Sequence, residues 1–253
     1  MGVMKIGIAG YGYVGQAHKE GLEWCNEILI SDPAKKYYAD LNQAEALIIC
    51  VSTPQGDNGS CDMGNVYSVL ENLNVNIPIL IKSTISLEGW KQIKHKFPNR
   101  QITFSPEFLR AKTALQDFKK EKQFYLGGGD TNFWGELLVE SLGQINVDIA
   151  NPEELILVKY FRNSFLATKV SFFNQIFDLC ESMDNVDYNT VKELITADKR
   201  IGDSHSSVTD QRGFGGHCFP KDTQAIVNTA KEKNIDLSVL NEAIKYNNKI
   251  RKD

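Results

Sequence analysis

The stretch GFGGHCFPKD, residues 213–222, places one thiol between a double glycine and a Pro-Lys-Asp sequence. Pro220 is well placed in the first turn of a helix that extends to Lys233, so Cys218 is expected at the N-terminus of that helix. A helix N-terminus favours the thiolate, which is the nucleophilic form of cysteine. Asp222 should lie one helical turn later on the same side. A reactive thiol beside a carboxylate is one interpretation, and an inert buried cysteine is the alternative.

A glycine-rich turn near the N-terminus is the second chemical signal. The motif GYGYVG lies between a short apolar run at residues 5–9 and a helical stretch at residues 14–24. Its three glycines let the chain turn, let the backbone approach a pyrophosphate, and let the helix pack on the strand. The start of the helix adds N–H donors for an anion. The cofactor-binding residues predicted in this turn are Gly10, Tyr11, Gly12, Tyr13, Val14 and Gly15.

The next strand, residues 27–31, leads into an acidic residue, Asp32. A carboxylate at this position can accept hydrogen bonds from both ribose hydroxyls of adenosine and would repel a 2′-phosphate. The pattern therefore predicts NAD as the cofactor, although Lys35 and Lys36 leave NADP open.

These motifs require elements that position them, and apolar runs predict those elements. Short runs alternate with helical intervals through the first 130 residues or so, which is typical of a Rossmann-type doubly wound parallel sheet in an α/β fold. Glycine and proline are absent from residues 153–183, whose apolar residues recur at helical spacing, so one long helix is expected after Asn151-Pro152. We expect an NAD-binding domain at residues 1–150 and, at 151–253, a small all-α domain that carries the cysteine and a homodimer surface. The strands are predicted at residues 5–9, 27–31, 46–51, 79–83, 101–105 and 124–127, and shorter helices at 188–197, 220–233 and 237–249.

Composition narrows the function classes. Lys plus Arg number 28 and Asp plus Glu 32, giving a net charge of −4 and no basic run suited to nucleic acid. Lys119, Lys120 and Lys122 are expected in a solvated loop. No apolar stretch is long enough for a membrane span. Five widely spaced cysteines without a CxxC pair predict a reducing, cytoplasmic location and no zinc site. His18, His95 and His205 are expected at the surface, with no metal site.

Motifs spread over the chain are similar to those of the UDP-glucose and GDP-mannose dehydrogenase family. That family oxidises a nucleotide sugar at C6 from alcohol to acid in two NAD-dependent steps, through a cysteine-bound thiohemiacetal and thioester. The motifs are GFGGHCFPKDT (213–223), SPEFLR (105–110), VSTP (51–54), KST (82–84), VKYFRNSFLATKVSFFN (158–174) and DKRIG (198–202).

The resemblance implies a role for each matched residue. Cys218 is the nucleophile, and Asp222 assists it or a water. Lys159 and Asn163 stabilise an oxyanion and hold that water. Glu107 serves as a general base or water anchor. Close to the cofactor, the implied binding residues are Val51, Ser52, Thr53 and Thr84, and Thr84 also contacts the water.

Each of these side chains also has a structural alternative. Lys159 could be a surface lysine with its stem on an apolar helix, Asn163 a solvated residue, Thr84 a capping hydroxyl, and Glu107 the start of a helix. His217, next to the thiol, either touches substrate or fills space.

Two departures from the family pattern bear on activity. Ala111 stands where the family usually has an acidic residue, and the family's third, nucleotide-sugar-binding domain has no counterpart here. The sequence therefore predicts poor turnover by the isolated chain. Two alternatives stay open: a silent NAD-binding protein that docks to a partner, and a 3-hydroxyacid-type dehydrogenase, which needs no cysteine.

Overall fold

The computed structural model describes residues 2–56, 61–216 and 218–252, and these form two compact units. The first unit contains the described residues up to Lys159, and the second contains those from Tyr160 onward, so the division falls within one helix. The predicted domain limits at residues 1–150 and 151–253 stay a prediction.

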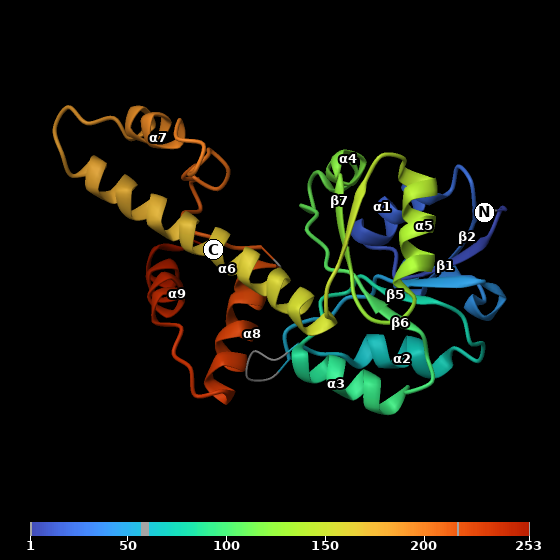
Figure 1. The fold of residues 1–253 in the computed structure, drawn as a ribbon. Helices are drawn as coiled ribbons and strands as arrows, with labels where there is room; N and C mark the ends of the chain where they lie inside the picture. Colours follow the sequence, from blue (N-terminus) through green and yellow to red (C-terminus); the bar gives the residue numbers. More distant parts are fainter. Residues whose placement is uncertain (1, 57–60, 217, 253) are drawn as a thin grey trace. The chain divides into compact units, whose positions relative to one another are not determined.

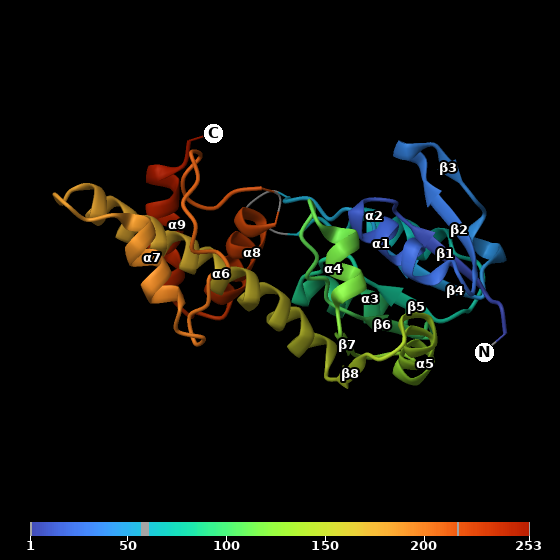
Figure 2. The ribbon, with the colours of Figure 1, turned by 90° about the horizontal axis from the view of Figure 1, so that it is seen from above.

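The first unit is built on a mostly parallel sheet (Figure 1), and its strands follow the order β3-β2-β1-β4-β5-β6 (Figure 2). β3 is antiparallel to β2 and lies at the edge of the sheet (Figure 2). A smaller parallel pair, β7-β8, continues the unit. The strands are β1 (Lys5–Ala9), β2 (Glu27–Asp32), β3 (Tyr37–Tyr38), β4 (Ala46–Ile49), β5 (Ile79–Ile81), β6 (Ile102–Phe104), β7 (Gln123–Leu126) and β8 (Asn146–Ile149). The predicted doubly wound α/β architecture is confirmed.

Helices cover both faces of this sheet, which is why its central strands are apolar along their whole length. One face packs against α1, α4 and α5, where Ile8, Ile48 and Trp134 belong to one buried cluster. On α2 and α3, Leu70 and Ile93 are buried. The elements that join the strands are α1 (Tyr13–Leu22), α2 (Gly64–Asn72), α3 (Leu87–Lys96), α4 (Ala114–Lys120), α5 (Thr131–Leu142) and the short 3-10 turns Pro33–Lys35 and Leu41–Gln43.

Helix α6 (Pro152–Glu181) starts where the sequence predicted a long helix. Pro152 occupies its first turn, and the Glu154 carboxylate accepts a hydrogen bond from the Asn151 backbone N–H at 3.0 Å. This contact satisfies a backbone donor at the start of the helix. None of the described helices is both long and apolar enough to cross a membrane.

The second unit packs three shorter helices around the later part of α6. Its core contains Ala167 and Val170 of α6 and Phe214, which lies in the loop before α8. Phe219 of α8 and Ile244 of α9 pack against them. The three are α7 (Tyr188–Thr196), α8 (Phe219–Glu232) and α9 (Ser238–Ile250). The expected small all-α region is therefore present.

Candidate active site

The glycine turn after β1 has the geometry that its sequence predicted. Gly10 has a φ of +89°, and a Cβ there would lie 2.7 Å from the backbone of Cys50 and Val51. A Cβ on Gly15 would lie 2.1 Å from the carbonyl oxygen of Gly10. Gly12, at the start of α1, has no atom within 4 Å of a built Cβ. Two glycines are thus required by packing, and the third leaves open space where a pyrophosphate could approach the helix N-terminus.

Asp32 lies at the end of β2, beside this turn. Its carboxylate accepts hydrogen bonds from the backbone N–H groups of Tyr11 at 2.7 Å and Lys35 at 3.3 Å. The Lys35 ammonium donates to the Tyr11 carbonyl oxygen at 2.7 Å. These bonds fix the orientation of a half-buried carboxylate next to the glycines, so the turn and the acidic residue fit a dinucleotide as one site.

The other residues assigned to the cofactor follow β4, which pairs with β1 in the parallel sheet, and β5, which pairs with β4. The Ser83 hydroxyl donates to the Val51 carbonyl oxygen at 2.7 Å, joining the two strand ends. The Ser52 carbonyl oxygen accepts from Asn65 at 2.9 Å, and Thr53 is buried. Thr84 is half-buried, and its carbonyl oxygen accepts from the Cys61 thiol. Ligands of open parallel sheets bind at this carboxyl edge.

Glu107, after β6, is buried and held by several groups. Its carboxylate accepts from the backbone N–H groups of Phe108 at 2.7 Å and Leu109 at 2.9 Å, and lies 3.6 Å from the Lys82 ammonium. Burial alone would raise the pKa of this carboxyl, but Lys82, His18, the Leu109 N–H and Lys159 together hold it below its ordinary value. Glu107 is therefore an ionised side chain oriented by its own turn.

Lys159 of α6 belongs to the same group. Its ammonium donates to the carbonyl oxygen of Glu107 and lies 5.4 Å from the centre of the Phe108 ring. The residue is only 8% exposed, which argues against the surface alternative for this lysine.

Two members of this buried group were not predicted. Lys82 donates to the Ser105 hydroxyl at 2.9 Å and the Pro106 carbonyl oxygen at 3.1 Å. The predicted surface position of His18 is wrong, because its side chain is fully buried on α1 against Phe118. A signal was available in the sequence, since His18 lies four residues before Leu22 on the apolar face of that helix.

The His18 ring is held on one side only. Its Nδ1 lies 2.9 Å from the carbonyl oxygen of Val14, and Nε2 has no hydrogen-bond partner among the described residues. Burial, and then the nearby Lys82 charge, lower the pKa of His18 to about 4. The ring is consequently neutral at neutral pH.

The second unit carries the thiol. Cys218 is the half-buried residue immediately before α8, and the Asp222 backbone N–H donates to its carbonyl oxygen at 2.8 Å. The Asp222 carboxylate is almost fully buried, accepts from the Asn163 side-chain amide at 2.6 Å, and pairs with the Lys221 ammonium at 2.7 Å. Asn163 is itself 8% exposed, which argues against its solvated alternative.

The glycines around the thiol do not all have the expected neighbours. We expected them to admit a bound substrate, but a Cβ on Gly213 would lie 2.2 Å from Asn247, and one on Gly215 would lie 2.5 Å from Arg251. Only Gly216 of the three, with a φ of +76°, has open space at its Cβ position. Packing against protein side chains explains the other two, and His217 lies outside the described residues.

The remaining cysteines have different surroundings. Burial raises the pKa of the Cys50 thiol well above its ordinary value, and Cys61 and Cys180 are buried. All five cysteines are free. In the part of the chain that the structure describes, no group of three or more His, Cys, Asp or Glu side chains is arranged to hold a metal ion.

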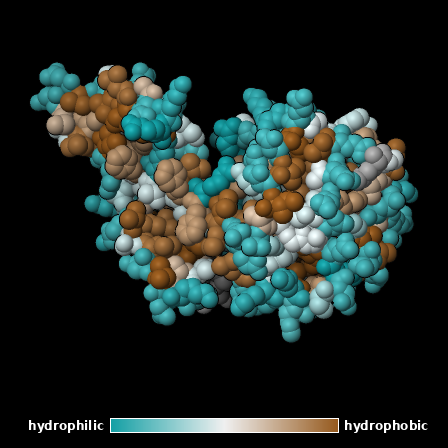
Figure 3. Space-filling model, in the orientation of Figure 1, coloured by the Kyte–Doolittle hydropathy of each residue, from teal (hydrophilic) through white to brown (hydrophobic). Residues whose placement is uncertain are grey.

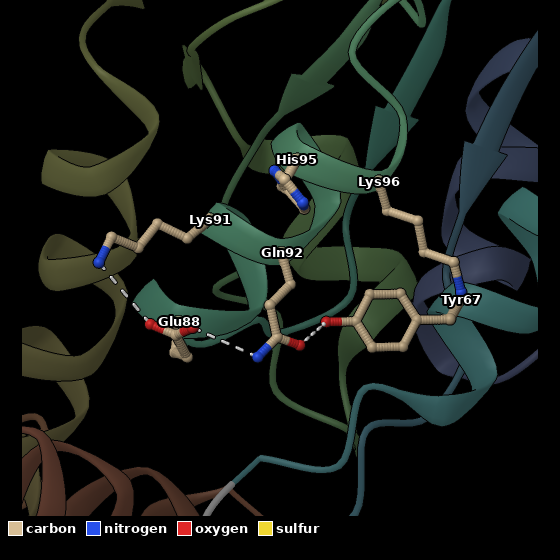
Figure 4. A pocket seen from close by; sticks show the side chains of 6 residues that line it. All are labelled: Tyr67, Glu88, Lys91, Gln92, His95 and Lys96. Carbon is tan, nitrogen blue, oxygen red and sulfur yellow. Dashed lines mark hydrogen bonds and ion pairs between the residues drawn. The ribbon is translucent and has the colours of Figure 1, made fainter.

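A surface pocket lies on α2 and α3, and none of its lining residues is a predicted site residue (Figure 4). Its polar groups bind one another: the Tyr67 hydroxyl donates to Gln92 at 2.7 Å, and Gln92 donates to Glu88 at 3.3 Å. This pairing leaves no evident role for the pocket in the chemistry predicted from the sequence. It is lined by Tyr67, Glu88, Lys91, Gln92, His95 and Lys96.

Comparison with known proteins matches both units. Residues 31–142 match the NAD binding domain of the UDP-glucose/GDP-mannose dehydrogenase family, and residues 154–249 match the central domain of the same family. The UDP-glucose 6-dehydrogenase of Rickettsia felis is 32% identical over 226 residues, covering 83% of this chain and 49% of that protein. The chain thus spans about half the length of the curated relatives it matches.

Solved structures show the same fold. A UDP-glucose dehydrogenase from Pyrobaculum islandicum superimposes with a TM-score of 0.84 at 24% identity, covering 98% of this chain and 68% of that one. A 3-hydroxyisobutyrate dehydrogenase from Mycobacterium tuberculosis gives a TM-score of 0.71 at 15% identity, covering 96% of this chain and 92% of that one. At these identities the likeness concerns the fold alone.

Proposed function

Since this chain belongs to the UDP-glucose/GDP-mannose dehydrogenase family, we propose that it oxidises a nucleotide sugar, of the UDP-glucose type, at C6 from alcohol to acid. The observation that carries the proposal is the buried Asn163–Asp222 pair, one helical turn from a thiol at a helix start. Burial of a carboxylate costs free energy unless a partner compensates it, and such groups are often found at functional sites. Here the amide partner also fixes the orientation of the carboxylate.

The NAD-binding domain holds the cofactor through the glycine turn and Asp32, and bound NAD supplies the hydride acceptor for both oxidation steps. After the first step, the Cys218 sulfur adds to the aldehyde carbon and the carbonyl oxygen takes up a proton, which gives a thiohemiacetal. Loss of a hydride from that carbon and a proton from its oxygen gives a thioester. Water then cleaves the carbon–sulfur bond, releasing the acid and restoring the thiol.

The other side chains support these steps. Lys159 supplies a cation for the developing oxyanion, and Asn163 holds the water. Asp222 is placed to assist the thiol or to take a proton from that water. Thr84 binds near the cofactor and the water, and Glu107 anchors the water or acts as its base. Because the Glu107 carboxylate also binds its own backbone, it has limited freedom to move during the reaction.

The direct test measures NADH formation with a panel of nucleotide sugars. We expect slow turnover from the wild-type chain alone, with two NADH for each sugar oxidised, and no completed second oxidation from Cys218→Ser. Cys25→Ser, which changes another half-buried cysteine, is the matched control. Turnover that survives Cys218→Ser would favour the 3-hydroxyacid-type alternative. NAD binding without any turnover, also after addition of a protein carrying the family's third domain, would favour the silent binding protein.

We also propose a homodimer formed through α6. The exposed apolar residues Phe161, Phe165, Phe172 and Leu179 follow one another at intervals of 4, 7 and 7 residues, as on one seam of a helix. Figure 3 shows several patches of apolar surface on the second unit. Such a stripe is a recognised mark of a protein interface.

Sedimentation of the wild type and a Phe165→Glu variant tests the dimer. We expect the variant to be a monomer and Val239→Glu, an exposed apolar position on α9, to stay dimeric. A wild-type monomer at all concentrations would contradict the proposal.

A cytoplasmic location is proposed on the ground that all five cysteines are free, as a reducing compartment would keep them.

A further inference from the structure

The segment that leads to Cys218 is held in place by side chains from two helices that come before and after it in the sequence. Residues 211–216 have little regular structure, and three of them, Arg212, Gly213 and Gly216, have positive φ angles of 56°, 52° and 76°. A backbone of this kind keeps one shape only when surrounding contacts determine it. Those contacts come from α6 and α9.

Asn247 of α9 binds both polar groups of one residue in the segment. Its Oδ1 accepts from the Phe214 backbone N–H at 2.6 Å, and its Nδ2 donates to the Phe214 carbonyl oxygen at 3.1 Å. Asn247 is 4% exposed and Phe214 is buried in the core of the unit. Loss of the amide would leave a buried donor and a buried acceptor without partners.

Asn174 of α6 holds the preceding residues in a similar way. Its Oδ1 accepts from the Arg212 guanidinium at 2.9 Å and from the Gly213 backbone N–H at 3.1 Å, and its side chain is 1% exposed. Arg251, at the end of α9, donates to the Arg212 carbonyl oxygen at 3.0 Å. The segment is therefore bound at consecutive peptides from both helices.

We propose that Asn247 is a positioning residue for the Cys218 thiol. The amide fixes Phe214, which precedes the thiol by four residues in the sequence, and this anchor restricts where the sulfur lies relative to the helix N-terminus. This inference rests on the proposed function, because it gives the fixed position a purpose in the reaction. Asn174 and Arg251 contribute to the same restraint.

The experiment follows alkylation of Cys218 by iodoacetamide between pH 6.5 and 9.5, with the modified peptide quantified by mass spectrometry. Two variants disturb the contact between Asn247 and Phe214, one by removing a side chain and one by adding a methyl group. Asn247→Ala removes the amide, and Gly213→Ala inserts a methyl group where Asn247 Oδ1 lies. We expect each variant to react about threefold or more slowly over this pH range, because the thiol is less well fixed at the helix start.

Ser171→Ala is the matched control. Ser171 is 3% exposed and donates from α6 to the Ala243 carbonyl oxygen of α9 at 3.1 Å, so this variant also removes a buried hydrogen bond between the same helices. It does not touch the segment, and its profile should coincide with that of the wild type. Circular dichroism establishes that each protein is folded.

A milder variant tests the proposal if Asn247→Ala does not fold. Arg251→Ala removes the bond to Arg212 from a half-buried side chain, and Arg251→Lys should partly restore the wild-type rate. The proposal would be overturned if folded Asn247→Ala or Arg251→Ala protein reacted at the wild-type rate or faster. Because labelling needs no turnover, the result is independent of whether the chain oxidises a sugar, which the NADH assay decides separately.

Discussion

The buried His18 ring should make the stability of the first unit depend on pH in a window where most proteins change little. In the unfolded chain the pKa of histidine is about 6.5, whereas burial lowers the pKa of His18 to about 4 in the folded state. A group with a lowered folded pKa contributes stability that is complete above 6.5 and is lost as pH falls through 6.5 toward 4. The loss from this group is about 2 kcal/mol between pH 7 and pH 5, because the unfolded state binds a proton that the folded state excludes.

Urea unfolding of the wild type and His18→Gln at several pH values measures this effect. Glutamine is neutral throughout, so the variant should lose about 2 kcal/mol less than the wild type over the same window. Its stability at pH 7 can differ for packing reasons, and only the change with pH is compared. Parallel stability curves for the two proteins would refute the reasoning, since they would mean that the ring takes up its proton equally well in the folded state.

Three further predictions concern the candidate site. Lys82→Met should lower the free energy of unfolding by about 3–5 kcal/mol, because it leaves the buried Glu107 carboxylate without its cation, and adding Glu107→Gln should recover much of that loss in urea titrations. Asp32→Ala should weaken NAD binding by about tenfold or more in calorimetry. Asp40→Ala is the control, because it removes a carboxylate that caps the 3-10 turn Leu41–Gln43 and should leave NAD affinity unchanged. Equal affinities for the wild type and both variants would contradict the cofactor assignment. Iodoacetamide should modify Cys218 before the other four cysteines of the native protein, and equal labelling would count against a reactive thiol.

The sequence could predict those parts of the fold in which a local pattern and tertiary packing agree. A strand buried on both faces needs a continuous apolar run, and the run from Ala46 to Val51 accordingly became β4 (Ala46–Ile49). The long helix was equally clear, because no glycine or proline interrupts it after Pro152. Predicted ends differ from the observed ends by one or two residues, as is usual where helices and strands fray.

The elements that were missed depend on partners distant in the sequence. β3 (Tyr37–Tyr38) is two exposed residues that form a strand only by pairing with β2. Lys119, Lys120 and Lys122 are solvent-exposed as predicted, but the predicted loop is wrong at Lys119 and Lys120, because both residues end helix α4. That helix is fixed by Phe118, which is buried among the side chains that pack on α1 and α5, and the charges around it concealed this anchor.

The candidate site was predicted where a motif carries its own geometry, as in the glycine turn with Asp32. It was incomplete where side chains meet across the sheet. Lys82 follows β5 and Glu107 follows β6, which are adjacent parallel strands, so the pairing could have been inferred from the predicted topology. A lysine is so seldom buried that composition alone argues against such an inference. The glycines before Cys218 were misinterpreted because their neighbours come from α9, more than thirty residues later.

The bonds from α9 to the thiol segment also constrain how the protein is made. Phe214 binds a side chain 33 residues further along the chain, and Arg212 binds one 39 residues further along. A ribosome adds residues in order, so the thiol has already been synthesised when the groups that hold its loop do not yet exist. During that interval the loop lacks its final restraint, and the segment acquires its shape only when α9 has emerged and folded. An expression fragment intended to display the native thiol must accordingly extend through Arg251.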